Sequence, residues 1–306
     1  MACFADTNWA LRTPVDCQTG VFTLCFRVVK IGIITDVHLY PTPGDGKTFA
    51  YHNPYPMERA PAQLESAIEI CRRAGVDQIA MLGDLSHIGD AASLSLGVPM
   101  LARAGAPVWM SPGNHDCVPR AEAMAEAVSA YGDGHVTFLG THATRVGDVH
   151  IAGLPLRDEG MQQPNGAAPD VSAWGDDLVV WAIHHPAVSL AERTRAVGLK
   201  FPGDLGNYET AVAPVHARTA PTLAIHGHAH VRDELVQGAL LQFSFAALIE
   251  PPHEVGILEI DRTANGWRVR RSHIAAAAHS AQRVPILSPD ATLWSFESGA
   301  WKREQG

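Results

Sequence analysis

Apolar and polar residues follow two different periods along the first half of the chain. Residues 30–35 form a dense apolar run, which is typical of a buried strand. Residues 62–74 instead carry apolar side chains three and four positions apart, and this spacing predicts a helix that ends at Gly75. The same order recurs twice, with strands predicted over 78–82 and 107–110 and helices over 94–104 and 120–131. Three strand–helix units in succession predict a parallel sheet with right-handed crossovers.

The second half of the chain is dominated by short predicted strands joined by polar loops. These strands are expected over 136–139, 149–152, 178–183, 222–225, 235–245, 255–260 and 267–271, the last two as a hairpin. Because no Pro/Ser-rich linker and no repeat divides the chain, we expect one α/β domain over residues 28–275, built on two sheets. Residues 1–27 show no periodicity and are predicted to be a poorly ordered extension. Residues 276–306 are predicted to be a tail, packed on the domain or at a dimer interface that Trp294 and Trp301 could support.

The composition is that of a globular protein with an acidic surface. The 306 residues are 46% apolar, and 32 acidic against 23 basic residues give a formal net charge of −9. This balance excludes wholesale disorder and disfavours extended nucleic acid or an anionic membrane as a partner. No apolar stretch approaches the roughly 20 residues needed to span a bilayer, and the N-terminus does not resemble a signal peptide. The five cysteines are scattered without a C-x-x-C pair, so we expect free thiols in a reducing cytoplasm.

Side chains that can bind metal ions follow directly after five of the predicted strands. In an open α/β sheet the carboxyl ends of the strands line the crevice that binds ligands. Nitrogen and oxygen ligands without thiolate suit Mn, Fe, Co or Zn. Seven of them are too many for one ion that keeps an open position, so two divalent ions sharing a carboxylate are expected. The ligand candidates are Asp36, His38, Asp84, Asn114, His184, His228 and His230.

The order of these residues defines a series of motifs: D-x-H from Asp36, G-D ending at Asp84, G-N-H-D over 113–116, His184, and G-H-x-H over 227–230. The series resembles the calcineurin-like metallophosphoesterases, and most of all the bacterial class III cyclic-nucleotide and glycerophosphodiester phosphodiesterases. The resemblance implies a four-layer α/β/β/α sandwich of two mixed sheets flanked by helices, with a dinuclear metal centre. It also implies that Asp36, His38 and His230 bind one metal, that Asn114, His184 and His228 bind the other, and that Asp84 bridges them.

Phosphoester hydrolysis is the chemistry that fits this set of residues. Two divalent ions would activate a bridging water as the nucleophile, which attacks phosphorus in line. Asn114 would help to neutralise the growing charge, and His115 would protonate the leaving oxygen. The favoured substrate is a small phosphodiester of the cyclic-nucleotide or glycerophosphodiester type. A phosphomonoesterase is the alternative, and a non-catalytic binding scaffold is disfavoured because His115 and all seven ligand candidates are present.

Several neighbouring residues are weaker candidates. Asp116 adjoins His115 and is a candidate to orient a histidine by a hydrogen bond. His185 and His226 are either hydrogen-bonding partners of the site or packed histidines, and His87 either faces the site or is an exposed loop residue. Three basic residues of the loop 186–209 and four residues of the loop 40–56 are either substrate contacts or ordinary loop positions. These are Arg193, Arg195, Lys200, Tyr51, His52, Asn53 and Tyr55. With residues 157–177, the two loops are expected to select between diester and monoester.

Overall fold

The computed structural model describes residues 27–41, 48–118, 120–154, 169–201, 204, 209, 212–278 and 285–304. The extension predicted over residues 1–27 lies outside this part of the chain, except for Arg27. No helix among the described residues is both long enough and apolar enough to cross a membrane.

The larger sheet has eight strands in the order β16-β15-β14-β13-β1-β4-β5-β6. Its parallel half consists of β1 (Val29–Ile34), β4 (Gln78–Met81), β5 (Val108–Met110) and β6 (Val136–Phe138). Its antiparallel half consists of β13 (Glu254–Thr263), β14 (Gly266–Ala275), β15 (Ala291–Glu297) and β16 (Ala300–Arg303). The predicted parallel sheet is therefore confirmed, and β1 joins its two halves by pairing with β13 and β4.

The smaller sheet has six strands in the order β11-β12-β10-β9-β8-β7. The strands are β7 (Ala143–Val146), β8 (Val149–Gly153), β9 (Val179–Ala182), β10 (Thr222–His226), β11 (Asp233–Gln237) and β12 (Leu240–Ser244). Strands β8, β9, β10 and β12 run parallel, whereas β7 and β11 are antiparallel edges. A separate two-stranded hairpin is formed by β2 (Thr48–Ala50) and β3 (Pro54–Pro56).

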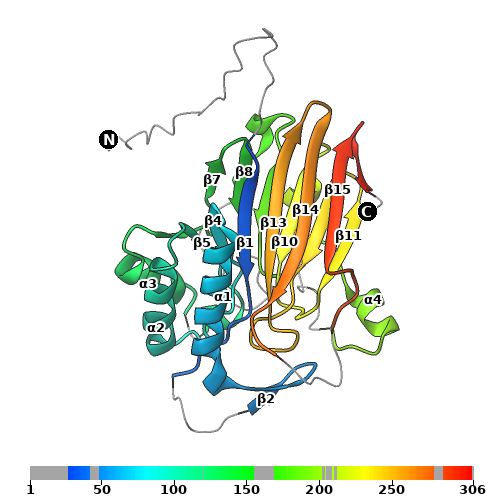
Figure 1. Cartoon of the computed structure of the whole chain (residues 1–306). Coiled ribbons are helices and arrows are strands. Elements are labelled where there is room, and N and C mark those ends of the chain that lie inside the picture. The colour runs from blue at the N-terminus through cyan, green and yellow to red at the C-terminus, as the bar shows by residue number, and fades with distance from the viewer. Residues whose placement is uncertain are drawn as a thin grey trace.

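Helices cover the parallel half of the larger sheet (Figure 1). They are α1 (Ala60–Ala74), α2 (Ala91–Ala102) and α3 (Ala123–Tyr131), and short helices α4 (Ala191–Ala196) and α6 (Ala213–His216) accompany the smaller sheet. Single turns of 3-10 helix lie at 57–59, 115–117 and 172–174.

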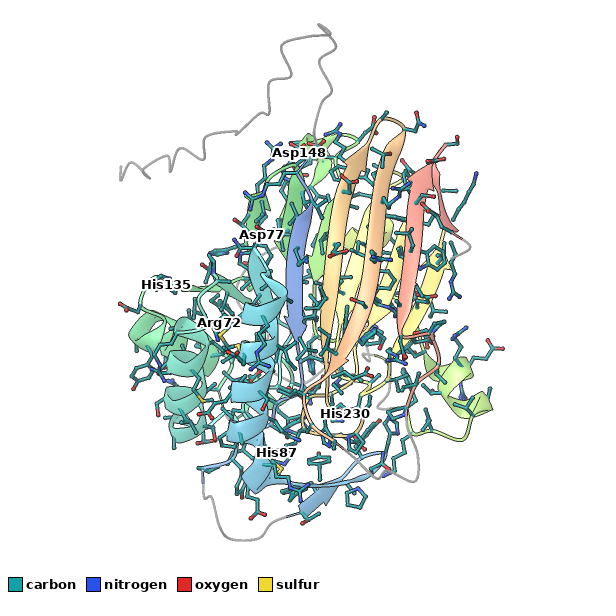
Figure 2. The ribbon with its side chains drawn as sticks, in the orientation of Figure 1. Arg72, Asp77, His87, His135, Asp148 and His230 are labelled. Carbon is teal, nitrogen blue, oxygen red and sulfur yellow. The ribbon has the colours of Figure 1, made fainter. Side chains whose placement is uncertain are left out.

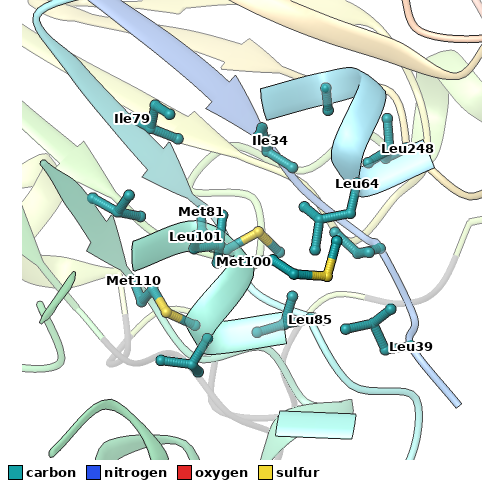
Figure 3. Packing of buried hydrophobic residues seen from close by; sticks show 14 of the residues in the cluster. Ile34, Leu39, Leu64, Ile79, Met81, Leu85, Met100, Leu101, Met110 and Leu248 are labelled. Carbon is teal, nitrogen blue, oxygen red and sulfur yellow. The ribbon is translucent and has the colours of Figure 1, made fainter. Parts of the chain in front are cut away.

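Three apolar clusters define the layers between these elements. Alternate residues of β1 point to opposite faces, so Ile34 packs beneath the helices with Leu64 and Met81 (Figure 3). Ile33 points the other way and packs between the two sheets with Phe243. Trp181 belongs to a third cluster with Val215 of α6, on the outer side of the smaller sheet. The layers follow the predicted α/β/β/α order.

The structure corrects one strand and adds others. The single strand predicted over 235–245 is wrong, because Gly238 adopts a left-handed conformation (φ 61°) and turns the chain between β11 and β12. Strands β2, β3, β7, β15 and β16 were not among the predicted elements. Trp301 of β16 is buried, and its indole N–H donates to the Ala239 carbonyl at 2.7 Å. This tryptophan therefore connects the larger sheet to the β11–β12 turn of the smaller sheet and presents no free surface.

The close approach of α1 to β1 gives a prediction for stability. A Cβ added at Gly32 would lie 2.5 Å from Cys71 Sγ and 3.4 Å from Cys71 Cβ. We expect Gly32→Ala to lower the free energy of unfolding by about 1–3 kcal/mol, because a packed core cannot admit the extra methyl group. Urea unfolding of a double-mutant cycle tests this. Introduced into the Cys71→Ala background, the same substitution should cost less, and an equal cost in both backgrounds would contradict the packing argument.

Candidate metal centre

The predicted ligands meet at one edge of the molecule, where strands of both sheets end. Asp36, Asp84 and Asn114 follow β1, β4 and β5 of the larger sheet, and His184 and His228 follow β9 and β10 of the smaller one. Figure 2 shows His230 and His87 at this edge, near the β2–β3 hairpin, whereas Asp77 and Asp148 lie higher in the view, away from it. The carboxyl ends of parallel strands thus bring together residues that are far apart in the sequence.

Three overlapping groups of side chains have the spacing of a metal site; one joins His38 to His87 and His115, and the other two consist of predicted ligands alone. Ligand atoms of Asp36, His38 and His230 lie within 4.8 Å of one another, and so do those of Asp36, Asp84 and His184. Asp84 Oδ2 lies 3.3 Å from His184 Nε2 and 3.7 Å from His38 Nε2, so this carboxylate is placed between the two groups.

The remaining ligand candidates border the second group. Asn114 Oδ1 lies 3.1 Å from His184 Nε2, and the ring of His228 lies 5.0 Å from the ring of His184. The structure therefore brings all seven candidates together. Their mixed oxygen and nitrogen donors fit a pair of divalent ions, and the assignment of each ligand to one ion stays a prediction.

Three of the candidate histidines are oriented by partners on their outer nitrogen. His184 Nδ1–H donates to the Leu82 carbonyl at 2.7 Å, and His230 Nδ1–H donates to the Glu250 carboxylate at 2.7 Å. His38 Nδ1 lies 3.2 Å from His87 Nδ1. Each contact occupies Nδ1 and leaves Nε2 facing the centre, which is how a protein fixes the ring of a metal-binding histidine.

The backbone adopts an uncommon conformation at five of the seven candidates. Asp36, His38, Asp84, His228 and His230 all have positive φ angles, between 51° and 61°. This left-handed region is sparsely populated by residues other than glycine and costs about 1–3 kcal/mol at each position. In both D-x-H and H-x-H it recurs at i and i+2, so the two turns direct alternate side chains to one side. Such a strained backbone persists only where hydrogen bonds and packing from the surrounding structure compensate its cost.

Two motif glycines provide the clearance that these turns need. A side chain at Gly113 would collide with the carboxylate and backbone nitrogen of Asp84. A side chain at Gly227 would collide with Thr35 and the carboxylate of Asp36, to which the neighbouring His228 N–H donates at 3.1 Å. The glycines of G-N-H-D and G-H-x-H therefore allow one ligand-bearing turn to pack directly on another.

Asp116 fastens the turn after β4 to the turn after β5. Its buried carboxylate accepts from the backbone N–H groups of Asp84 at 2.6 Å, Ser86 at 2.8 Å and Gly113 at 3.0 Å. Asp116 is thus a partner of the site through main-chain donors, one of which belongs to the candidate ligand Asp84. Burial, together with the charge of Asp84, raises the pKa of Asp116 to about 7, against the effect of these donors.

His115 and His87 form a stacked pair beside the candidate ligands. Their ring centroids are 4.8 Å apart, and His115 Nδ1–H donates to the backbone carbonyl of His87 at 2.6 Å. The ring of His38 is 4.9 Å from that of His115. The sequence did not decide whether His87 belongs to the site. In the structure it does, because it contacts the candidate ligand His38 and the candidate proton donor His115.

Of the other weak candidates, two histidines and Lys200 lie at or near the site, and two arginines do not. His185 and His226 are buried, and the His185 ring lies 4.0 Å from that of His228. Arg193 forms a bidentate pair with Asp233, and Arg195 donates to its own helix, so both act within the smaller sheet and its loop. Lys200 reaches the rim of the site, where its ammonium lies 5.7 Å from the centre of the Tyr51 ring.

Glu250 and Phe49 are the parts of the site that the sequence did not reveal, whereas Tyr51 and Tyr55 were among its weaker candidates. Glu250 follows β12 within an apolar segment, and no motif spacing marks it. Three aromatic rings of 48–56 lie against site histidines: Phe49 is 4.4 Å from His87, Tyr51 is 5.2 Å from His230 and Tyr55 is 6.3 Å from His38.

Pairs of carboxylates and histidines determine the protonation of the centre when no metal ion is bound. Burial alone would raise the pKa of Asp84, but His184 and His115 outweigh it and hold that pKa well below its usual value. Burial alone would lower the pKa of His184, but the charge of Asp84 outweighs burial and raises that pKa to about 9. Asp36 and Glu250 similarly raise the pKa of His230 to about 10 despite its burial. At neutral pH these two histidines carry the positive charge that bound metal ions would otherwise supply.

The comparisons with known proteins agree with this arrangement. The family model for the calcineurin-like phosphoesterases matches residues 29–232, more than half of the chain. The chain therefore belongs to the calcineurin-like phosphoesterases, a class of metal-dependent phosphoric ester hydrolases. No curated protein matches the sequence.

Solved structures are similar to this chain at low sequence identity. A dimetal phosphatase from Danio rerio is 15% identical, with a TM-score of 0.57, and the match covers 81% of this chain and 96% of that one. A protein from Thermus thermophilus is 15% identical, with a TM-score of 0.49 and coverage of 76% and 94%. The phosphopantetheinyl hydrolase of Mycobacterium tuberculosis is 15% identical, with a TM-score of 0.43 and coverage of 71% and 89%.

The raised pKa values predict how metal affinity depends on pH. Metal binding has to displace the protons of His184 and His230, whose pKa values are about 9 and about 10. The apparent affinity should therefore rise between pH 6.5 and 8.5, by up to about tenfold per pH unit for each proton released. These protons stabilise the metal-free fold below about pH 6.5, and that stabilisation is lost as the pH rises through about 9 to 10.

Competition between the protein and a chromogenic chelator for Co²⁺ measures this slope. His184→Gln should reduce it, whereas His142→Gln, at an exposed position, should leave it unchanged. An affinity of the wild-type protein that does not vary with pH would contradict the prediction.

Proposed function

We propose that the protein hydrolyses a small phosphodiester, of the cyclic-nucleotide or glycerophosphodiester type, with two divalent metal ions drawn from Mn, Fe, Co and Zn. The observation that carries the proposal is the position of Asp84 between two groups of candidate ligands, with Asn114 and His115 beside them. When bound, the ions supply an activated water and neutralise charge on the phosphoryl group.

The aromatic wall over the site supports a diester as the substrate. A phosphodiester carries a second organic group that has to be accommodated next to the reacting phosphate. Phe49 and Tyr51, which are half-buried, lie beside His87 and His230, and their rings offer an apolar surface for that group. Tyr55, beside His38, is buried and supports this wall from the core. A monoester has only one organic group to place, so the same wall would contribute less to its binding.

The contacts of His115 support its proposed role as the proton donor to the leaving oxygen. Because the His87 carbonyl can only accept, His115 Nδ1 carries the hydrogen of that 2.6 Å bond, and Nε2 is the nitrogen left for the substrate. The stacked ring of His87 and the ring of His38 hold this orientation. Asp84 Oδ1 accepts the His115 backbone N–H at 2.9 Å, which fixes the same residue relative to the candidate bridging carboxylate.

A phosphomonoesterase remains the alternative, since a dinuclear centre can serve either reaction. The two functions are separated by assaying metal-reconstituted protein with bis-p-nitrophenyl phosphate and p-nitrophenyl phosphate side by side. We expect the larger kcat/KM for the diester, because the hairpin contacts its second aryl group. Preference for the monoester would overturn the diesterase proposal, and no turnover of either ester with Mn, Fe, Co or Zn would favour a binding scaffold.

The role of His115 gives a separate prediction. We expect His115→Ala to lower kcat by about 10²–10⁴-fold, as loss of a general acid does, while the protein still binds two metal ions. Metal content by mass spectrometry and kcat are measured on the same preparation, with the exposed His142→Ala as the matched control. If His115→Ala emptied a metal site, the assignment of His115 as a proton donor would be wrong.

A further inference from the structure

A carboxylate outside the recognised motifs joins the candidate metal centre to the hairpin above it. Glu250 is completely buried and lies beyond the residues matched by the family model. One carboxylate oxygen accepts from His230 Nδ1 at 2.7 Å, and the other accepts from the backbone N–H of Asn53. Both oxygens are therefore used, one by a candidate ligand and one by the hairpin.

The backbone around Glu250 holds its carboxylate in a fixed place. The N–H of Leu248 donates to the Thr35 carbonyl at 3.0 Å, and that of Ile249 donates to the Asp36 carbonyl at 3.1 Å. The segment leading to Glu250 is thus hydrogen-bonded along the turn that carries Asp36. On its other side, the Glu250 carbonyl accepts the His253 N–H at 2.9 Å. Because its backbone is fixed, the Glu250 carboxylate determines where its partners His230 and Asn53 lie.

Two hydrogen bonds tether the hairpin to the body of the protein beside His230. Strands β2 and β3 pair only with each other among the described strands, and a hairpin that joins no larger sheet is marginally stable by itself. The Asn53–Glu250 bond is one tether to the body of the protein. A second is the bond from His52 Nε2–H to the Ala229 carbonyl at 3.0 Å, between the two histidines of H-x-H. Both tethers end next to His230.

We propose that Glu250 is a positioning residue that couples metal binding at His230 to the placement of the hairpin 48–56. The inference rests on the proposed metal centre, and it extends the proposed function because the hairpin is the wall that would hold the second group of a diester. A carboxylate behind a metal-binding histidine fixes its ring, and loss of such a partner typically lowers metal affinity by about 10–100-fold. Here the same carboxylate also orders the loop that contacts the substrate.

The matched pair Glu250→Gln and Glu259→Gln tests the first half of the proposal. Glutamine keeps the size of the side chain but offers one acceptor instead of two, so it cannot serve both His230 and Asn53. Glu259 lies on β13 and pairs with Lys30 at 3.0 Å, away from the centre. Isothermal titration with Mn²⁺ should show one of two binding steps weakened by about 10–100-fold in Glu250→Gln, with no change in Glu259→Gln.

Hydrogen–deuterium exchange of the hairpin tests the second half. In the wild-type protein, saturating Mn²⁺ should slow exchange of the amides in 48–56, and in Glu250→Gln the same occupancy should give much less protection. A peptide covering 300–303 serves as the internal reference, since it lies in β16 of the large sheet. With either ester, Glu250→Gln should raise KM in addition to any change in kcat.

Two results would overturn the inference. One is unchanged Mn²⁺ affinity in Glu250→Gln, and the other is hairpin exchange in the wild-type protein that does not respond to Mn²⁺. The second result needs no variant, so it decides the matter even if Glu250→Gln does not fold. Failure of the proposed function looks different: the wild-type protein would bind two ions and protect the hairpin without turning over either ester.

Discussion

The burial of four carboxylates at one edge of the molecule is the constraint on which the site depends. Asp36, Asp84, Asp116 and Glu250 are all nearly inaccessible to solvent. An ionised carboxylate buried without partners costs several kcal/mol, so each must receive hydrogen bonds or opposite charge. Main-chain N–H groups supply part of this to every one of them, from His228, His115, Asp84 and Asn53 among others. Histidines contact Asp36, Asp84 and Glu250 in addition, and the turns are shaped by the need to provide these donors.

That requirement accounts for the unusual backbone of the ligand-bearing turns. A strand that continued in the extended conformation would send consecutive side chains to opposite faces. The left-handed residues at Asp36 and His38, and again at His228 and His230, bring alternate side chains to the same side and turn N–H groups inward. The conformational cost is local, whereas the hydrogen bonds that hold it come from both sheets. Gly113 and Gly227 make this possible because the facing turn leaves no room for a Cβ.

The order of motifs was enough to predict the fold and to select the residues that meet. Each motif directly follows a parallel strand, so the apolar pattern and the metal-binding residues indicate the same strand ends. The parallel half of the larger sheet could be predicted from this agreement. The hairpin turn at Gly238 was missed because the apolar residues on both sides of it look like one strand. Glu250 could not be found for a different reason. Its partners, His230 and Asn53, are 20 and 197 positions away in the chain, and no local pattern records such contacts.

Counting the buried charges changes what the site is expected to select. The motifs alone contain two ligand carboxylates, so two divalent ions would leave the pocket strongly positive. The structure places Glu250 and Asp116, whose pKa is about 7, in the same buried cluster, and their negative charge would offset part of the charge of two divalent ions. A site whose positive charge is partly offset gains less from each further negative charge on a substrate than a strongly cationic one does. A phosphodiester is a monoanion, whereas a phosphomonoester is largely dianionic at pH 7 because its second pKa is about 6. Charge balance and the aromatic hairpin are therefore two independent physical arguments for the proposed phosphodiester substrate.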